Sequence, residues 1–221
     1  EKEGPTGMLV GSMLALMAFL LAITMGMAAD RFDARRGAVL AEANSIGTTY
    51  LRTDFLPQPA ASQSQELIRE YVPLRIIEGE PSDEEIAAIV ARSDEILSEL
   101  WSIAGGPASE TPDSEMLALY ITTLNETIDA NTTRVTAGLY ARVPETIALL
   151  LFFGSILTLG MVGFSAGLTK RRSPLTAVVL VVVLGAVLAL IIDIDRPTGG
   201  TLTTGQQPLI DLEGQIGPPS P

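Results

Sequence analysis

The chain contains no cysteine and no histidine. Without cysteine it forms no disulfide and offers no thiolate nucleophile. Without histidine it lacks the usual general base near neutral pH and the commonest metal ligand. These absences argue against most hydrolase mechanisms and against zinc sites. We therefore expect that the protein is not an enzyme and that it binds no metal ion and no cofactor.

Charge is also absent from three long stretches. Residues 4–29, 146–169 and 173–192 contain no Asp, Glu, Lys or Arg. About 20 apolar helical residues are enough to cross a bilayer core that is about 30 Å thick. We predict transmembrane helices at residues 1–29, 144–169 and 174–192. The first stretch has no basic segment before it and is longer than the apolar part of a signal peptide, which favours a retained helix over a cleaved signal.

Charged residues gather between the first two stretches. Residues 30–143 hold 9 Arg and 19 Asp plus Glu, and the whole chain has a net charge of −12. Its apolar residues recur at helical spacing, and no segment alternates like a strand. We predict an all-α integral membrane protein: a transmembrane helix bundle with an inserted helical extramembrane domain at residues 30–143. The Gly/Pro-rich tail at residues 193–221 is expected on the same side of the membrane, with a disordered end.

Short basic loops mark the cytoplasmic side of a membrane protein. The loop at residues 170–173 carries the sequence "KRR" at its start, which places the acidic domain outside the cell. Arg31, Arg35 and Arg36 directly follow the first stretch and argue for the opposite orientation. We favour an extracytoplasmic domain.

Local signals predict individual helices of the domain. Ser82 and Glu85 have the spacing of a capping box, and Gly105, Gly106 and Pro107 are expected to end the helix that begins there. A second helix is expected at residues 113–142, and a third ends or kinks near Pro73. The first apolar stretch continues without a proline until residue 57, so that one helix of almost 50 residues could leave the bilayer and enter the domain.

Small residues recur every three or four positions along the first stretch. Such a face allows another helix to approach closely in lipid, either within a bundle or between subunits. The candidate packing residues are Gly7, Gly11, Ala15, Ala18, Ala22 and Gly26, with Gly163 and Gly167 in the second stretch.

Two polar stripes follow the predicted helices of the domain. One lies in residues 31–52 and the other in residues 125–136. In one interpretation they are the solvent-exposed faces of amphipathic helices. In the other they face a water-filled vestibule above the membrane. The candidate pore or vestibule residues are Glu42, Asn44, Thr49, Arg52, Asn125 and Asp129.

Two carboxylates, Asp193 and Asp195, fall at the end of the third apolar stretch, where a helix dipole disfavours negative charge. We expect compensation by a charge network at the membrane surface, and an ion-binding role for the two carboxylates remains an alternative. The expected members of this network are Arg31, Arg35, Arg36, Arg142, Asp193, Asp195 and Arg196.

Several short motifs resemble a known family. They are "FDARRGAVLAEANSIGTTYLR" after the first apolar stretch, "LIREYV" at residues 67–72, "LNETID" at residues 124–129 and "DIDRPTGGTL" after the third stretch. In this order they resemble the prokaryotic bestrophin-like membrane proteins of unknown function. The positions that match the family pattern are Glu42, Asn44, Arg52, Asn125, Asp129, Asp195, Arg196 and Pro197.

The resemblance implies a further transmembrane helix ahead of Glu1 and a distant likeness to bestrophins, which are pentameric anion channels. Our first hypothesis is an oligomeric channel or transport pore in the lipid bilayer, built from copies of this chain. An acidic pore mouth would concentrate cations, which conflicts with the anion channel analogy, so the ion stays open. The alternative is an accessory subunit that docks in a larger membrane complex through its small-residue faces. No nucleic acid is expected as a partner.

Overall fold

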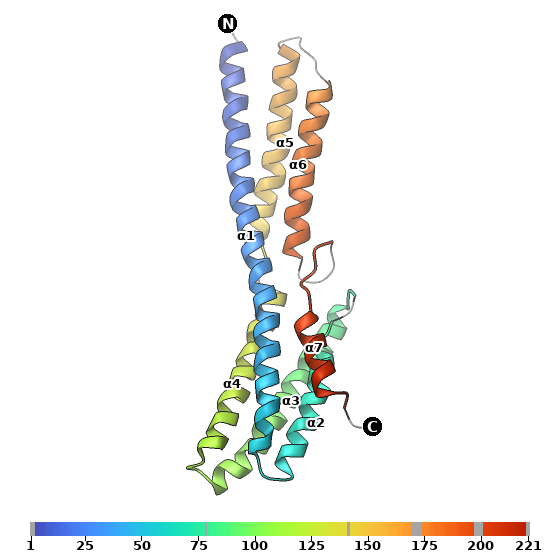
Figure 1. Ribbon diagram of the computed structural model, residues 1–221. Helices are drawn as coiled ribbons and strands as arrows, with labels where there is room; N and C mark the ends of the chain where they lie inside the picture. Colours follow the sequence, from blue (N-terminus) through green and yellow to red (C-terminus); the bar gives the residue numbers. More distant parts are fainter. Residues whose placement is uncertain (1–2, 78, 141, 169–173, 197–200, 220–221) are drawn as a thin grey trace. The chain divides into compact units, whose positions relative to one another are not determined.

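The computed structural model describes residues 3–77, 79–140, 142–168, 174–196 and 201–219. Within these ranges the secondary structure is helical and contains no strand, which confirms the all-α class (Figure 1). The basic loop expected at residues 170–173 and Pro197 lie outside the described residues. The chain divides into two compact units, which we call unit 1 and unit 2.

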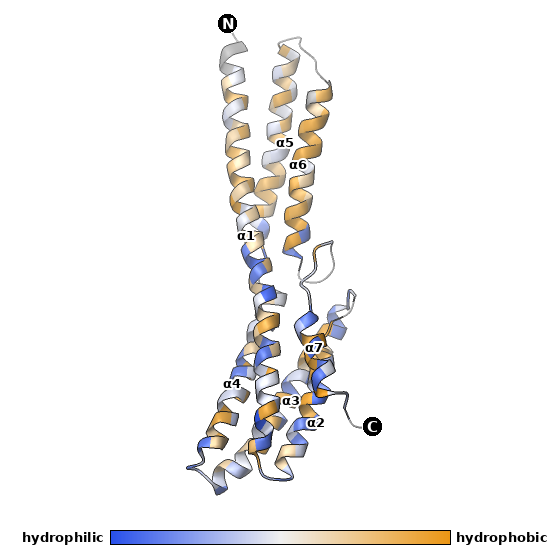
Figure 2. Ribbon diagram, viewed as in Figure 1, coloured by the Kyte–Doolittle hydropathy of each residue, from blue (hydrophilic) through white to orange (hydrophobic). Residues whose placement is uncertain are grey.

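Unit 1 consists of Glu1–Phe32 and Arg142–Leu202. It holds the first part of α1 (Glu3–Arg52), together with α5 (Glu145–Leu168) and α6 (Pro174–Asp195). Its small core includes Met17 and Leu21 of α1, Leu151 of α5 and Ile191 of α6. Most of the other large apolar side chains of these helices are exposed. Figure 2 shows the resulting apolar colouring along α5, α6 and the first part of α1.

Among the described residues, three helices are long and apolar enough to cross a membrane. They are α5, residues 177–195 of α6, and α1 through its apolar first part. One helix of 50 residues forms α1, which confirms the long helix predicted from the sequence. Since α1 rises ~1.5 Å per residue, it is ~75 Å long, more than twice the thickness of a bilayer core.

Unit 2 consists of Asp33–Ala141 and Thr203–Pro221. It holds the rest of α1, η1 (Thr53–Phe55), α2 (Ala60–Leu74), α3 (Asp83–Glu110), α4 (Glu115–Val135), the π-helical segment η2 (Thr136–Tyr140) and α7 (Gln207–Ile216). α3 packs against both α2 and α4, and α7 packs against α2. The core includes Ile46, Tyr71, Ile96 and Leu124, one from each of the four longest helices of the unit.

The start of α3 follows its sequence signal. The Ser82 hydroxyl accepts a hydrogen bond from the Glu85 backbone N–H, and the Glu85 carboxylate accepts one from the Ser82 backbone N–H. The predicted capping box is therefore confirmed. The predicted end is wrong, because α3 runs through Gly105, Gly106 and Pro107 to Glu110. Burial of Ala104 and contacts of Ala108 with the core hold this last part in place despite the proline.

Two further boundaries differ from the prediction. The helix expected at residues 113–142 is α-helical only over Glu115–Val135 and then becomes π-helical. The tail, whose end was expected to be disordered, forms α7 at Gln207–Ile216, with Leu209, Leu212 and Ile216 buried. Their spacing of three and four residues matches one face of a helix, and this apolar face stabilises the segment against unit 2. α2 ends at Leu74, directly after Pro73, as the proline predicts.

Candidate functional site

A fully buried carboxylate lies at the centre of unit 2. Glu42 of α1 has an exposed fraction of 0%. It shares its helix face with Val39 and Ile46, which are both part of the apolar core. Because a buried charge is costly unless it is paired and hydrogen-bonded, this position requires partners from neighbouring helices.

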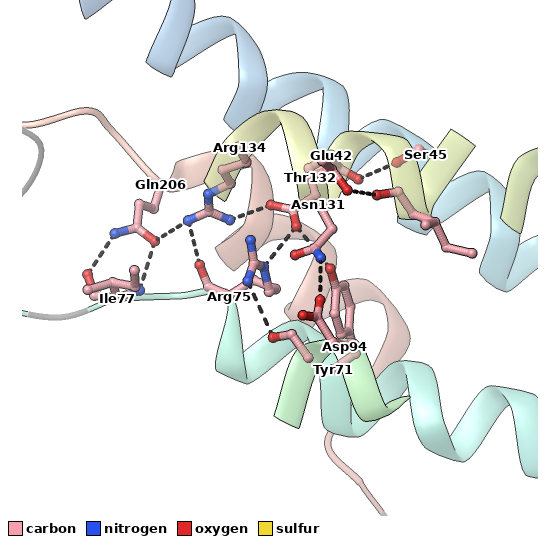
Figure 3. A network of polar contacts seen from close by, with 12 residues as sticks. Glu42, Ser45, Tyr71, Arg75, Ile77, Asp94, Asn131, Thr132, Arg134 and Gln206 are labelled. Carbon is pink, nitrogen blue, oxygen red and sulfur yellow. Dashed lines mark hydrogen bonds and ion pairs between the residues drawn. The ribbon is translucent and has the colours of Figure 1, made fainter. Parts of the chain in front are cut away.

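Three side chains from two other segments satisfy the Glu42 carboxylate (Figure 3). Arg75 Nε and the Tyr71 hydroxyl donate to Oε1 at 2.8 and 3.0 Å. Arg134 donates to Oε2 through Nη1 at 2.5 Å. Arg75 follows α2 directly and Arg134 lies in the last turn of α4, so that one carboxylate connects three segments of the unit. We call Glu42, Tyr71, Arg75 and Arg134 the Glu42 cluster.

Further hydrogen bonds extend from the cluster. Arg75 Nη1 donates to Ser93 Oγ of α3 at 3.3 Å. Arg134 Nη2 donates to the Arg75 carbonyl at 2.7 Å and to Gln206 Oε1 at 3.5 Å. Ser93 brings α3 into the polar network, and Gln206, which directly precedes α7, brings in a fifth segment. In Figure 3 the side chains of Arg75, Arg134 and Gln206 come from separate segments and lie close together.

The charges of the Glu42 cluster do not cancel within it. One carboxylate faces two guanidinium groups, whose side chains are 5% and 12% exposed. Burial raises the pKa of Tyr71 well above its usual range, and the adjacent Glu42 carboxylate raises it further. Tyr71 therefore stays protonated and donates to Glu42. The Arg75 guanidinium carbon also lies 5.7 Å from the centre of the Tyr71 ring, within cation–π range.

The sequence-predicted pore residues divide into two groups. Glu42 and Thr49 are buried, and Thr49 Oγ1 lies 2.9 Å from Thr127 Oγ1 of α4. Both interpretations of the stripe on α1 placed these two side chains in contact with water, and the structure places them in the protein interior. The reason is that helical spacing defines a common face but does not say what covers it.

The remaining candidates lie at or near the surface of unit 2. Asn44 is exposed. Arg52 donates to the Leu119 carbonyl at 2.7 Å. Asn125 and Asp129 are exposed on α4 and are joined by a hydrogen bond of 3.4 Å. These residues are not part of the Glu42 cluster.

The sequence did not predict Tyr71, Arg75, Arg134 or Gln206 as site residues. One signal was present at Arg75, a charged residue within the apolar segment "VPLRII", where a buried charge is the natural explanation. Arg134 is the only basic residue of α4. Neither signal identifies Glu42 as the partner, because these residues are 33 and 92 positions away from it.

Backbone groups hold the two aspartates at the end of α6. Asp195 accepts hydrogen bonds from the Val143 N–H, at 3.0 Å to each carboxylate oxygen. Asp193 accepts from the backbone N–H of Thr201 at 2.9 Å and of Leu202 at 3.1 Å. These contacts join the end of α6 to the segment before α5 and to residues 201–202.

The basic residues of the expected charge network lie in different surroundings. Arg31 donates to the Met27 carbonyl at 3.4 Å within α1. Arg35 is buried, whereas Arg36, Arg142 and Arg196 are exposed. The network as a whole stays a prediction.

The small-residue face of α1 is exposed in the part of the chain that the structure describes. Gly7, Gly11, Ala15, Ala18, Ala22 and Gly26 are all exposed. The intrachain contacts of α1 in unit 1 come instead from the face of Met17, Leu21 and Ala28. In α5, Gly163 and Gly167 have open space around them, and the close contact is at Gly154, where an added Cβ would lie 3.3 Å from Met17 Sδ. Packing between subunits through the small-residue face stays a prediction.

No group of three or more acidic side chains that could hold a metal ion occurs among the residues the structure describes. Both oxygens of Glu42 already accept hydrogen bonds from arginines or tyrosine, so the carboxylate is not available to a cation in this conformation.

Fold and site together define a helical protein with three helices suited to a membrane and a second unit organised around a buried carboxylate. The sequence model of the Bestrophin-like domain matches residues 3–209. The chain belongs to this family, as its motifs predicted. Comparison with curated proteins gave no match, and comparison with solved structures gave none either.

Proposed function

We propose that several copies of this chain form a channel or transport pore in a prokaryotic plasma membrane. The observation that carries the proposal is the family match over residues 3–209, which includes residues of both units. The Bestrophin-like family is associated with channels rather than enzymes. The residues of the chain do not identify the ion or substrate.

The exposed surfaces of unit 1 support a position in lipid. Phe19 of α1, Phe153 of α5 and Val182 of α6 are more than half exposed, at 62%, 58% and 62%. Such apolar exposure is unfavourable in water and neutral in hydrocarbon. In this arrangement α1 is too long for the bilayer, and its residues in unit 2 extend beyond it. We propose that unit 2 lies on the extracytoplasmic side.

The exposed small-residue face of α1 supports assembly from several copies. At Gly7, Gly11 and Gly26 an added Cβ would meet no atom within 4 Å, so a second helix has room to approach the backbone there. Close approach through small residues is a main source of helix association in lipid. A second copy of the same chain offers the same face, which makes a symmetric contact possible.

Exposure favours some of the predicted polar residues as candidates for the pore mouth. Glu42 and Thr49 are 0% and 1% exposed, so little of either side chain is within reach of an ion. Arg52 is half-buried, whereas Asn44, Asn125 and Asp129 are exposed and are the predicted residues most accessible to an ion. Among them Asp129 carries a full charge and has the largest expected influence on ion selectivity.

Reconstitution of the purified full chain into liposomes tests the proposal. We expect flux of a small inorganic ion, measured with separate assays for chloride, nitrate, potassium and sodium, above that of empty liposomes. Asp129→Ala should change the flux, whereas Asp113→Ala, which removes an exposed carboxylate from the turn before α4, should not. A reconstituted oligomer without flux of any of these ions contradicts the pore. If the chain then co-purifies with other membrane subunits from its native cells, the accessory-subunit alternative is supported.

A further inference from the structure

α7 is a short helix held against unit 2 by an apolar face, by a hydrogen bond at its end and by a polar clamp at its start. Leu209, Leu212 and Ile216 are buried, with exposed fractions of 0%, 7% and 8%. Leu212 reaches α1 at Gly47, where an added Cβ would lie 3.3 Å from Leu212 Cδ1. The Ile216 carbonyl accepts a hydrogen bond of 3.0 Å from Arg69 Nε of α2.

The polar clamp is the side chain of Gln206. Its Nε2 donates to the Ile77 carbonyl at 2.6 Å, and its Oε1 accepts from the Ile77 N–H at 2.9 Å. The Gln206 amide thus pairs with both backbone groups of one residue, as a neighbouring strand would. Oε1 also accepts from Arg134 Nη2 at 3.5 Å. Figure 3 shows Gln206 between Ile77 and Arg134.

Several features make α7 easier to detach than the other helices of unit 2. It has ten residues and no side-chain hydrogen bond at its N-cap, whereas α3 has 28 residues and a capping box. Gly205 precedes its N-cap residue, and Gly217, Pro218 and Pro219 follow its end. Three buried side chains must offset the conformational entropy of ordering the whole segment, so local detachment requires less free energy than global unfolding.

Arg134 links this segment to the buried carboxylate. Its Nη1 donates to Glu42, while its Nη2 donates to Gln206 and to the Arg75 carbonyl. Directly after Arg134 and Val135 the chain changes from an α-helix to a π-helix. π-Helical turns are rare and occur often at functional sites. The position of Arg134 therefore depends on contacts at both ends of its guanidinium group.

We propose that α7 is a releasable strap, and that its docking through Gln206 orders Arg134 on Glu42 at the end of α4. Linkage makes the effect reciprocal: release of α7 loosens the last turn of α4, and disruption of the Glu42 cluster loosens α7. The strap is a conformational device within unit 2, which a partner or a change in the tail can use to act on the Glu42 cluster. It goes beyond the proposed pore and does not require it.

Hydrogen exchange of the full chain in lipid nanodiscs tests the strap. In the native chain, the amides of residues 207–216 should exchange at least ~10-fold faster than those of residues 68–72 in α2, because α7 opens locally. Gln206→Ala should accelerate exchange in α7, at Ile77 and in residues 131–135 of α4. It should leave residues 117–121 of the same helix unchanged.

Three further variants make the result decisive. Gln207→Ala is the matched control, because Gln207 is exposed and its side chain donates to Asp211 within α7. Gly47→Val, which places a side chain against Leu212, should reproduce the pattern of Gln206→Ala by a different route, whereas Gly37→Val on the same helix should not. Equal exchange in Gln206→Ala and Gln207→Ala overturns the proposal. Acceleration throughout unit 2 in both Gln206→Ala and Gly47→Val overturns it as well, because α7 would then be an inseparable part of the core.

Discussion

Replacing Glu42 by glutamine tests the structural role of the buried carboxylate. Glu42→Gln keeps the size of the side chain and removes its charge, which leaves Arg75 and Arg134 without a counter-ion in the interior. Removing one partner of a buried ion pair typically costs ~3–5 kcal/mol. That loss is a large part of the ~5–15 kcal/mol that usually stabilises a domain. We expect unit 2 to lose a corresponding share of its free energy of unfolding.

Urea unfolding of the chain in detergent micelles measures this loss. The single tryptophan, Trp101, lies in α3 and reports on unit 2 by its fluorescence. Glu126→Gln is the matched control, since Glu126 is an exposed carboxylate of α4 and should change stability by less than ~0.5 kcal/mol. A loss of less than ~1 kcal/mol for Glu42→Gln would refute the reasoning, because it would mean that the two arginines need no buried counter-ion.

Arg134→Met tests the Glu42 cluster from the side of one of its arginines. Alone it should also destabilise unit 2, because Glu42 then keeps only Arg75 and Tyr71 as partners. Combined with Glu42→Gln it should cost less than the sum of the two single changes, since the charges are removed together. Additive losses would show that the two side chains act independently.

Three further predictions concern other parts of unit 2. Gly37→Ala should stabilise the unit by ~0.5–1 kcal/mol, because α1 is helical there and the added Cβ meets open space. Gly47→Ala should stabilise it less, because Leu212 Cδ1 would lie 3.3 Å from the added Cβ. Equal gains in the free energy of unfolding in urea would contradict this close contact. Ser82→Ala should lower the free energy of unfolding by ~0.5–2 kcal/mol, because it removes the capping box. Ser98→Ala on the exposed face of α3 should have little effect. Similar losses for the two variants would mean that the cap does not stabilise α3. Burial raises the pKa of Tyr71 and Tyr120, so their neutral forms stabilise the folded state below the unfolded pKa of about 10 and this contribution is lost as the pH rises further. As the pH rises, phenolate absorbance from these two residues should therefore appear only when the helical circular dichroism signal is lost. Tyr→Phe variants assign the absorbance to each residue. Phenolate absorbance in a folded chain would contradict their burial.

Local signals in the sequence predicted the parts of the fold that local interactions determine. The capping box at Ser82, the end of α2 after Pro73 and the continuous α1 all follow from residues close together in the chain. The end of α3 was wrong because Gly105, Gly106 and Pro107 are strong local signals that tertiary packing of the last turns overcomes. For α7, the glycines and prolines around it obscured an apolar face that was readable at residues 209, 212 and 216.

The candidate site was only partly predictable. Helical spacing correctly placed Glu42 and Thr49 on one face of α1, but the elements that cover this face come from residues 71–75, 127 and 134. Such distant contacts leave no periodic pattern in a single sequence. Whether the polar face of α1 contacts protein or water therefore follows only from the folded structure.

Cysteine accessibility tests the central claim, that the apolar helices lie in lipid and unit 2 lies in water. The natural chain contains no cysteine, so a single introduced thiol gives an unambiguous signal. Val182→Cys places it in the middle of α6, and Asn125→Cys places it on the exposed face of α4. With a membrane-impermeant maleimide added outside intact cells, the account predicts rapid labelling at position 125 and none at position 182. Rapid labelling at position 182 would contradict it.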